Sequence, residues 1–213
     1  MTGGAQSTKH PGLNLGERHG EANDKAETPV FGFWVFMMSD AVIFGLLFAN
    51  YLTMRHATAG APGPHALFDM KSVAAETFLL LTSSLTFGMA SLAMKYDIKD
   101  EQHARPLVVW LLVTLVLGCC FLALELHDFQ SMLLHGGAPQ RSGYLSSFWI
   151  LVPLHGLHVL GASIWMIAIL GQISKYGVDG KVKVAVLRLG VLWHFLDVVW
   201  VAIFSVVYIG GLA

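Results

Sequence analysis

The chain alternates between five long apolar stretches and short polar segments. A helix needs about 20 apolar residues to cross a bilayer, and each stretch reaches that length. The stretches cover residues 30–54, 72–94, 107–126, 147–173 and 186–209. Because only a helix satisfies its backbone hydrogen bonds within one such segment, the pattern predicts an all-α integral membrane bundle of five transmembrane helices.

The segments between the stretches have the composition of loops. Glycine and proline gather in residues 56–71 and 135–146, and charged residues gather in 96–106. Residues 1–29 are polar, without the apolar core and small-residue cleavage site of a secretory signal. We therefore expect residues 1–29 to form a disordered cytoplasmic tail, and residues 30–213 to form one five-helix membrane domain.

Composition and charge exclude several classes of protein. Of 213 residues, 55% are apolar and only 13% are charged, whereas a soluble domain carries about 25% charged residues. The net charge of −1 gives no basic surplus to neutralise phosphates, so we expect no nucleic-acid partner. The two cysteines, Cys119 and Cys120, are adjacent within one apolar stretch and build no disulfide framework.

The basic residues predict the orientation of the bundle. With the N-terminus inside the cell, ten of them fall on the inner side and three on the outer side. The inner ones are Lys9, Arg18, Lys25, Lys95, Lys99, Arg105, Lys175, Lys181, Lys183 and Arg188, and the outer ones are Arg55, Lys71 and Arg141. Because cytoplasmic loops carry the excess of Lys and Arg, we expect the N-terminus inside and the C-terminus outside.

Seven polar residues inside the apolar stretches are the candidates for function. A charge at the bilayer centre costs about 2.5–3.5 kcal/mol on insertion scales, so such a residue normally has a partner or a role. Five candidates lie near the predicted midplane and two nearer the outer face. They are Asp40, His155, His158, His194 and Asp197 at the midplane, and Glu76 and Glu125 toward the outside.

The spacing of these candidates predicts contacts between helices. His155 and His158 are three residues apart, as are His194 and Asp197, so each pair lies on one helical face. We expect both pairs to face the bundle interior and to bond across helices.

Three interpretations of the buried polar residues are open. In the first, His155 and His194 hold a b-type haem between two helices. In the second, Asp40, Asp197 and the histidines relay protons, as such chains do in pumps. In the third, which we favour, the seven residues tie helices together and contact lipid headgroups or partner subunits; interhelical hydrogen bonds are worth about 0.6 kcal/mol each.

Several motifs resemble one family. The stretch Trp193-His194-Phe195-Leu196-Asp197-Val198-Val199-Trp200 closely resembles the final-helix signature of subunit III of the haem-copper respiratory oxidases, and His155-Gly156-Leu157-His158-Val159 resembles its other signature. Residues 76–84 are similar to a further segment of the family. Residues 31–34 and 141–143 are most similar to its ubiquinol-oxidising, cytochrome o branch. The resemblance runs from about Phe31 to the C-terminus.

The resemblance implies a role that the composition does not reveal. It implies an accessory subunit of a bacterial proton-pumping ubiquinol oxidase, which reduces oxygen to water in the cytoplasmic membrane. This chain then has no catalytic residue, metal ligand or cofactor of its own; haem and copper belong to subunit I. Subunit I, subunit II, a small subunit IV and bound phospholipid are the expected partners.

The sequence leaves two alternatives to this role open. One is subunit III of a cytochrome c oxidase, because the electron donor is handled by other subunits. The other is a free-standing b-haem membrane protein. Larger members of the family have seven helices, and a five-helix chain is expected to leave a groove that lipid or another subunit fills.

Overall fold

The computed structural model of the chain describes residues 20–60, 69–96 and 105–212. Its elements are α1 (Gly20–Met54), α3 (Met70–Tyr96), α4 (Arg105–Leu134), the 3₁₀ turn η2 (Pro139–Arg141), α5 (Gly143–Tyr176), α6 (Gly180–Ile203), the π-helical segment η3 (Phe204–Ile209) and α7 (Gly210–Leu212). The described residues contain no strand.

Five of these helices are long and apolar enough to cross a membrane. The candidate spans are Phe31–Met54, Met70–Met94, Arg105–Leu134, Gly143–Tyr176 and Gly180–Ile209, the last combining α6 with η3. The predicted all-α bundle with five transmembrane helices is therefore confirmed.

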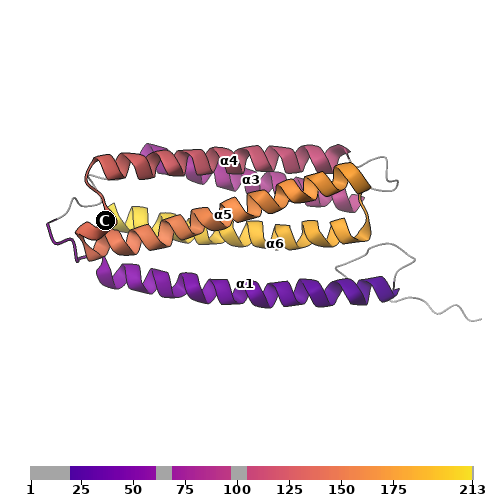
Figure 1. Cartoon of the computed structure of the whole chain (residues 1–213), viewed down its shortest axis with the longest axis horizontal. Helices are drawn as coiled ribbons and strands as arrows, with labels where there is room; N and C mark the ends of the chain where they lie inside the picture. The colour runs from indigo at the N-terminus through magenta and orange to yellow at the C-terminus, as the bar shows by residue number, and fades with distance from the viewer. Residues whose placement is uncertain (1–19, 61–68, 97–104, 213) are drawn as a thin grey trace, which may run out of the picture.

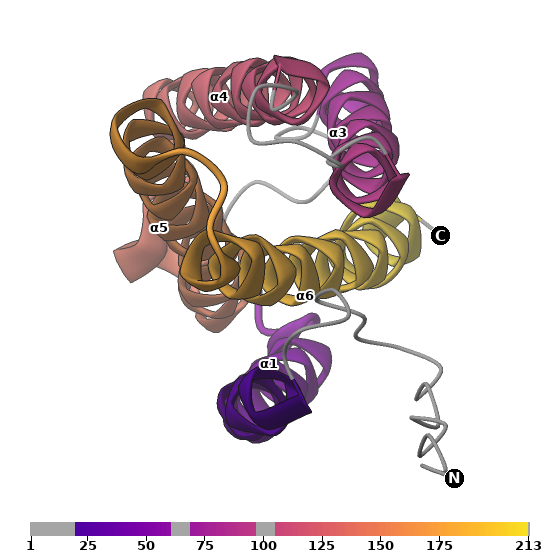
Figure 2. The ribbon, with the colours of Figure 1, turned by 90° about the vertical axis from the view of Figure 1, so that its right-hand side faces the viewer.

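Four of the helices form a ring and the fifth lies beside it. The long helices run side by side along the bundle (Figure 1). Seen from one end, α3, α4, α5 and α6 surround a common interior, and α1 packs outside the ring (Figure 2). The contacts agree, because each ring helix touches its two neighbours while α1 touches α5 and α6.

Aromatic side chains fill the ring, and aliphatic ones cover its outside. Trp193, Trp200 and Phe121 are at most 2% exposed, and the Phe121 and Trp200 rings meet edge to face with centroids 4.8 Å apart. On the outside, by contrast, Leu85 and Val198 are each 69% exposed. This arrangement suits a bilayer, because lipid tails are as apolar as leucine.

The helices extend further than the apolar stretches predict. α1 begins at Gly20, so residues 20–29 of the predicted disordered tail are helical, while residues 1–19 lie outside the described part. α6 begins at Gly180 rather than at 186 because the Asp179 carboxylate accepts a hydrogen bond from the backbone N–H of Val182 at 2.8 Å. Such an N-cap satisfies a helix-terminal donor that otherwise has no partner.

The end of α4 is set by two glycines beyond the helix. Gly136 has a φ of 81°, and its N–H donates to the Leu133 carbonyl, while the Gly137 N–H donates to the Met132 carbonyl at 2.8 Å. This pair of hydrogen bonds is the Schellman motif. The motif needs one residue in the left-handed backbone conformation, and it therefore favours glycine at that position. α4 thus continues to Leu134, eight residues beyond the predicted end at 126.

Candidate functional site

Asp40 and His158 form the first polar contact near the midplane. His158 on α5 donates from Nδ1 to the carbonyl of Leu154 at 2.8 Å. Its other nitrogen, Nε2, lies 3.9 Å from Oδ2 of Asp40 on α1. Asp40 is 8% exposed, and the Phe44 ring packs on the His158 ring with centroids 5.4 Å apart. A polar contact therefore accompanies the apolar packing between α1 and the ring.

His155 connects α5 to α6 inside the ring. The residue is fully buried, and its Nε2 donates to the Leu196 carbonyl at 3.2 Å. The imidazole packs against Phe121 of α4 and Trp200 of α6, at centroid distances of 5.9 and 5.2 Å. His155 therefore lies where three helices meet.

His194 lies at the edge of the ring rather than in its interior. Its side chain is 48% exposed, and Nδ1 lies 3.6 Å from Oδ2 of Asp197 on the same helix. The shorter contact of Nδ1 is with the hydroxyl of Ser84 on α3, at 2.9 Å. His155 and His194 thus bond to different helices, and no group of three His, Cys, Asp or Glu suited to a metal ion occurs among the described residues.

Asp197 is buried at the α6 midplane position. It is 7% exposed, and in the described part of the chain neither of its carboxylate oxygens has a hydrogen-bond partner. Its remaining contact is the 3.6 Å approach to His194.

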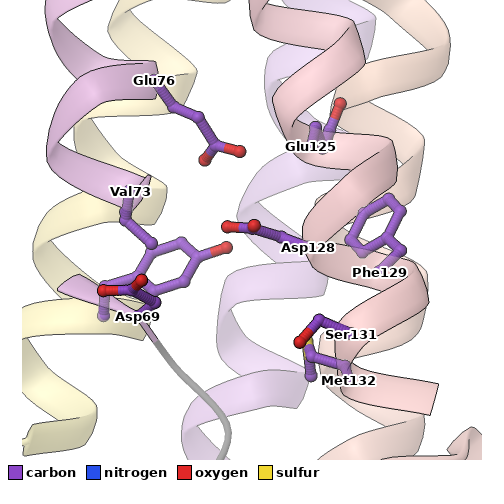
Figure 3. A pocket seen from close by; sticks show the side chains of 9 residues that line it. Asp69, Val73, Glu76, Glu125, Asp128, Phe129, Ser131 and Met132 are labelled. Atoms are coloured by element: carbon purple, nitrogen blue, oxygen red, sulfur yellow. The ribbon is translucent and has the colours of Figure 1, made fainter. Parts of the chain in front are cut away.

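The two glutamates line a small cavity at the end of the ring where α3 begins and α4 ends, the end predicted to face outside. We call this cavity the acidic pocket. It is lined by Asp69, Val73, Glu76, Glu125, Asp128, Phe129, Ser131, Met132 and Tyr208. Glu76 and Asp128 extend toward one another from α3 and α4, and Glu125 lies one turn along α4 (Figure 3).

The acidic pocket is small. The volume open to the centre of a water molecule is about 30 Å³. One water molecule needs roughly 10–15 Å³ when the volume is measured in this way, so the pocket has room for about two water molecules. Four of its nine lining residues carry carboxyl groups, and none is Lys, Arg or His.

Both glutamates are buried, and one carboxyl oxygen of each has no hydrogen-bond partner among the described residues. Glu76 is 1% exposed and Glu125 is 4% exposed, and the Oε1 atom of each has no partner among the described residues. The Glu125 carboxyl lies against Gly156 of α5, where a Cβ would overlap it. The glycine between the two histidines of the His155–Val159 motif therefore gives this carboxyl its space.

Three titratable lining residues, Asp69, Asp128 and Tyr208, were not predicted from the sequence. Asp128 follows Glu125 by three residues and so lies on the same helical face. That spacing was a usable signal, but the third apolar stretch was expected to end at 126, so Asp128 fell outside the predicted span. Asp69, in the segment before α3, and Tyr208, in η3, reach the pocket only through the packing of the helices.

Comparison with known proteins extends over almost the whole chain. The family described as "Cytochrome c oxidase subunit III" matches residues 16–212. A protein of Pseudomonas aeruginosa named "Cytochrome bo(3) ubiquinol oxidase subunit 3" is 39% identical over 197 residues, which cover 92% of each chain.

Two further relatives have similar names. A Pseudomonas putida protein with the same name is 42% identical over 189 residues, covering 89% of each chain. A Bacillus subtilis protein named "Quinol oxidase subunit 3" is 36% identical over 183 residues, covering 86% of this chain and 87% of its own. The chain therefore belongs to the cytochrome c oxidase subunit III family.

Proposed function

We propose that the chain is subunit III of a bacterial ubiquinol oxidase of the bo(3) type. The observation that carries this proposal is the match to quinol oxidase subunits at 36–42% identity along nearly their full length. Such a subunit belongs to a multi-subunit oxidase that reduces oxygen to water and pumps protons. We place the complex in the bacterial cytoplasmic membrane, with haem and copper in subunit I.

Within that complex the chain acts through packing and buried polar contacts. His155 bonds to α6 and His194 to α3, while Asp40 and His158 accompany the packing of α1 on the ring. Through these contacts the midplane histidines fix the positions of the helices relative to one another. The proposed role is to hold subunit I in its working arrangement, beside subunit II and a small subunit IV, and not to carry electrons.

A groove on the outside of the ring suits a phospholipid. It lies between the beginning of α4 and the end of α5, has a volume of about 550 Å³, and is lined by Arg105, Val108, Val109, Leu112, Leu170, Ile173 and Ser174. Its apolar walls fit an acyl chain, and the Arg105 guanidinium fits a lipid phosphate, which arginine binds in bidentate geometry. We propose that bound phospholipid seals the contact with neighbouring subunits here.

Affinity purification of the tagged chain from its native membrane tests this function. We expect a larger haem-bearing protein and a copper-free subunit II to be recovered with it, together with quinol-dependent oxygen consumption. A subunit II that contains copper would assign the chain to a cytochrome c oxidase instead.

The same preparation tests the alternative that the chain is a free-standing b-haem membrane protein. Recovery of the chain without any haem-bearing partner would contradict the proposal. A Soret absorbance band of one haem per chain in the isolated subunit would identify a b-haem protein.

A further inference from the structure

His194 carries a polar ring atom on the outside of the ring of helices. Its Nδ1 contacts the Ser84 hydroxyl of α3 at 2.9 Å, and its imidazole meets the Phe87 ring edge to face. In the described part of the chain, Nε2 has no hydrogen bond, and 48% of the side chain is exposed. Because Nδ1 is on the side of the imidazole that contacts α3, the exposed part is the one that carries Nε2.

The position of His194 along the span makes this exposure unfavourable. The residue lies at the middle of the span Gly180–Ile209, and the hydrocarbon layer is about 30 Å thick, so lipid headgroups and water do not reach it. Polar residues within membrane helices almost always face the bundle interior and pair with another polar group. The outward Nε2 therefore indicates a hydrogen-bonding group that lies beyond this chain.

Asp197 positions the imidazole from below the surface. Its Oδ2 lies 3.6 Å from Nδ1 of His194, and neither of its buried oxygens has a hydrogen-bond partner among the described residues. A neighbouring subunit does not reach these oxygens, because both are covered by the chain itself. The carboxylate attracts the Nδ1 side of His194 inward, which leaves Nε2 for a contact outside.

The surface around His194 has the features of a helix-packing interface. Val198 and Val201 follow it on α6 by four and seven residues, so the three share one face, and both valines are exposed. On α3, Gly88 lies one turn beyond Ser84, and a Cβ there would meet nothing within 4 Å. Small residues beside a polar one let another helix approach closely. We call His194, Val198 and Val201 the outer stripe of α6, the helix that both α1 and α3 contact (Figure 2).

We propose that one membrane-spanning helix of another oxidase subunit packs on the outer stripe of α6 and bonds to Nε2 of His194 through a hydroxyl or carboxamide side chain. Ser, Thr, Asn and Gln bond across membrane helices. Each both donates and accepts, so it satisfies Nε2 whichever ring nitrogen carries the proton. Lipid tails have no such group. The proposal rests on the proposed function, which supplies the neighbouring subunits.

Two substitutions of His194 separate the outward contact from the contact with Ser84. The amide of His194→Gln reaches about as far as Nε2, whereas the shorter amide of His194→Asn lies near the position of Nδ1. The oxidase is immobilised through a tag on this chain, and release of the other subunits into detergent is timed. We expect His194→Asn to speed release of the bound subunit about 3–20-fold, as loss of one interhelical hydrogen bond predicts. His194→Gln should stay within about twofold of the wild type.

The pair of variants also defines the contrary results. Equal release by the wild type and His194→Asn would overturn the proposal. Faster release from His194→Gln than from His194→Asn would overturn it as well, because that order assigns the imidazole to its contact with Ser84 inside this chain.

A second measurement keeps His194 intact and so remains informative if its variants do not assemble. Val198, one turn from His194 and exposed, is replaced by the photo-cross-linker benzoylphenylalanine, and native membranes are irradiated. We expect a covalent product with another oxidase subunit, on a membrane helix that has Ser, Thr, Asn or Gln within one turn of the linked residue. A product with lipid alone, or with a second copy of this chain, would contradict the proposal.

The two proposals fail in different ways. Recovery of the complete oxidase with position 198 linked only to lipid would overturn the contact at the outer stripe of α6 and leave the proposed function intact. A preparation without any haem-bearing subunit would contradict both.

Discussion

Gly156 is the residue on which the fit of the acidic pocket depends most directly. A Cβ at this position would overlap the carboxyl of Glu125, which packs against the glycine from α4. We predict that Gly156→Ala destabilises the chain by about 1–3 kcal/mol, the usual cost of forcing extra atoms into a packed site. The measurement is unfolding of the purified chain on titration with SDS, followed by tryptophan fluorescence.

Gly161 provides the matched control, because it lies on the same helix and a Cβ there would meet nothing within 4 Å. Gly161→Ala should leave stability unchanged or raise it by up to about 1 kcal/mol, since alanine favours helix more than glycine does. Equal destabilisation by the two substitutions would show that loss of glycine itself, and not the Glu125 contact, is responsible.

Sequence reasoning located the glutamates but not their relation to each other. Both were expected nearer the outer face because their positions along the apolar stretches are readable from the sequence. That Glu76 and Glu125 line one cavity depends on α3 and α4 being neighbours in the ring, and residue spacing within one helix carries no information about which helices are adjacent. For the same reason, His194 was expected inside the bundle although its side chain is 48% exposed.

At the scale of elements, two hydrogen bonds join α3 to α6 inside the ring. The indole N–H of Trp193 donates to the hydroxyl of Ser83, and that of Trp200 donates to the hydroxyl of Thr77, both at 3.1 Å. Trp200 is fully buried, so removal of its acceptor leaves a donor without a partner. Thr77→Val, which keeps the shape of the side chain, should therefore cost about 0.6–1.7 kcal/mol, which spans the average and the largest value found for interhelical hydrogen bonds in a membrane protein.

Thr82, on the same helix, provides the control for Thr77→Val. It distinguishes loss of the Trp200 hydrogen bond from the general effect of replacing threonine by valine. Its hydroxyl donates only to the carbonyl of Phe78 one turn earlier and is exposed. Thr82→Val should change the free energy of unfolding by less than about 0.5 kcal/mol, as surface substitutions usually do. SDS titration of both variants checks the pair, and a loss of stability for Thr82→Val as large as that for Thr77→Val would contradict the role of the Trp200 bond.

The length of α4 shows where the apolar pattern fails as a guide to helix ends. The third apolar stretch was predicted to end at 126, and His127 and Asp128 follow directly after it. The helix nevertheless continues to Leu134, and Glu125 and Asp128 line the acidic pocket on the inside of the ring. Charged residues indicate the end of a membrane helix when they face water. Charged residues that face a polar cavity inside the bundle give the same sequence pattern, so the apolar pattern alone does not separate the two cases.

For the whole molecule, the exposed apolar surface and the charged loops divide the chain into a membrane layer and two aqueous ends. Large apolar side chains are exposed on each of the five long helices, as lipid or partner subunits require. The loop at η2 and the turn between α5 and α6 lie at opposite ends of α5. These two loops therefore report which end of the bundle faces the cytoplasm.

Ten basic residues lie on one side of the predicted topology and three on the other. This count predicts that the end of the bundle with the turn between α5 and α6 faces the cytoplasm. We replace Cys119 and Cys120 by alanine and introduce single cysteines as Gln140→Cys in η2 and Lys181→Cys at the start of α6, both exposed positions. In right-side-out spheroplasts, a membrane-impermeant maleimide should label the cysteine at 140 and not that at 181, because the excess of Lys and Arg is retained inside. Labelling of both after permeabilisation controls for reactivity, and the opposite pattern would place the N-terminus outside.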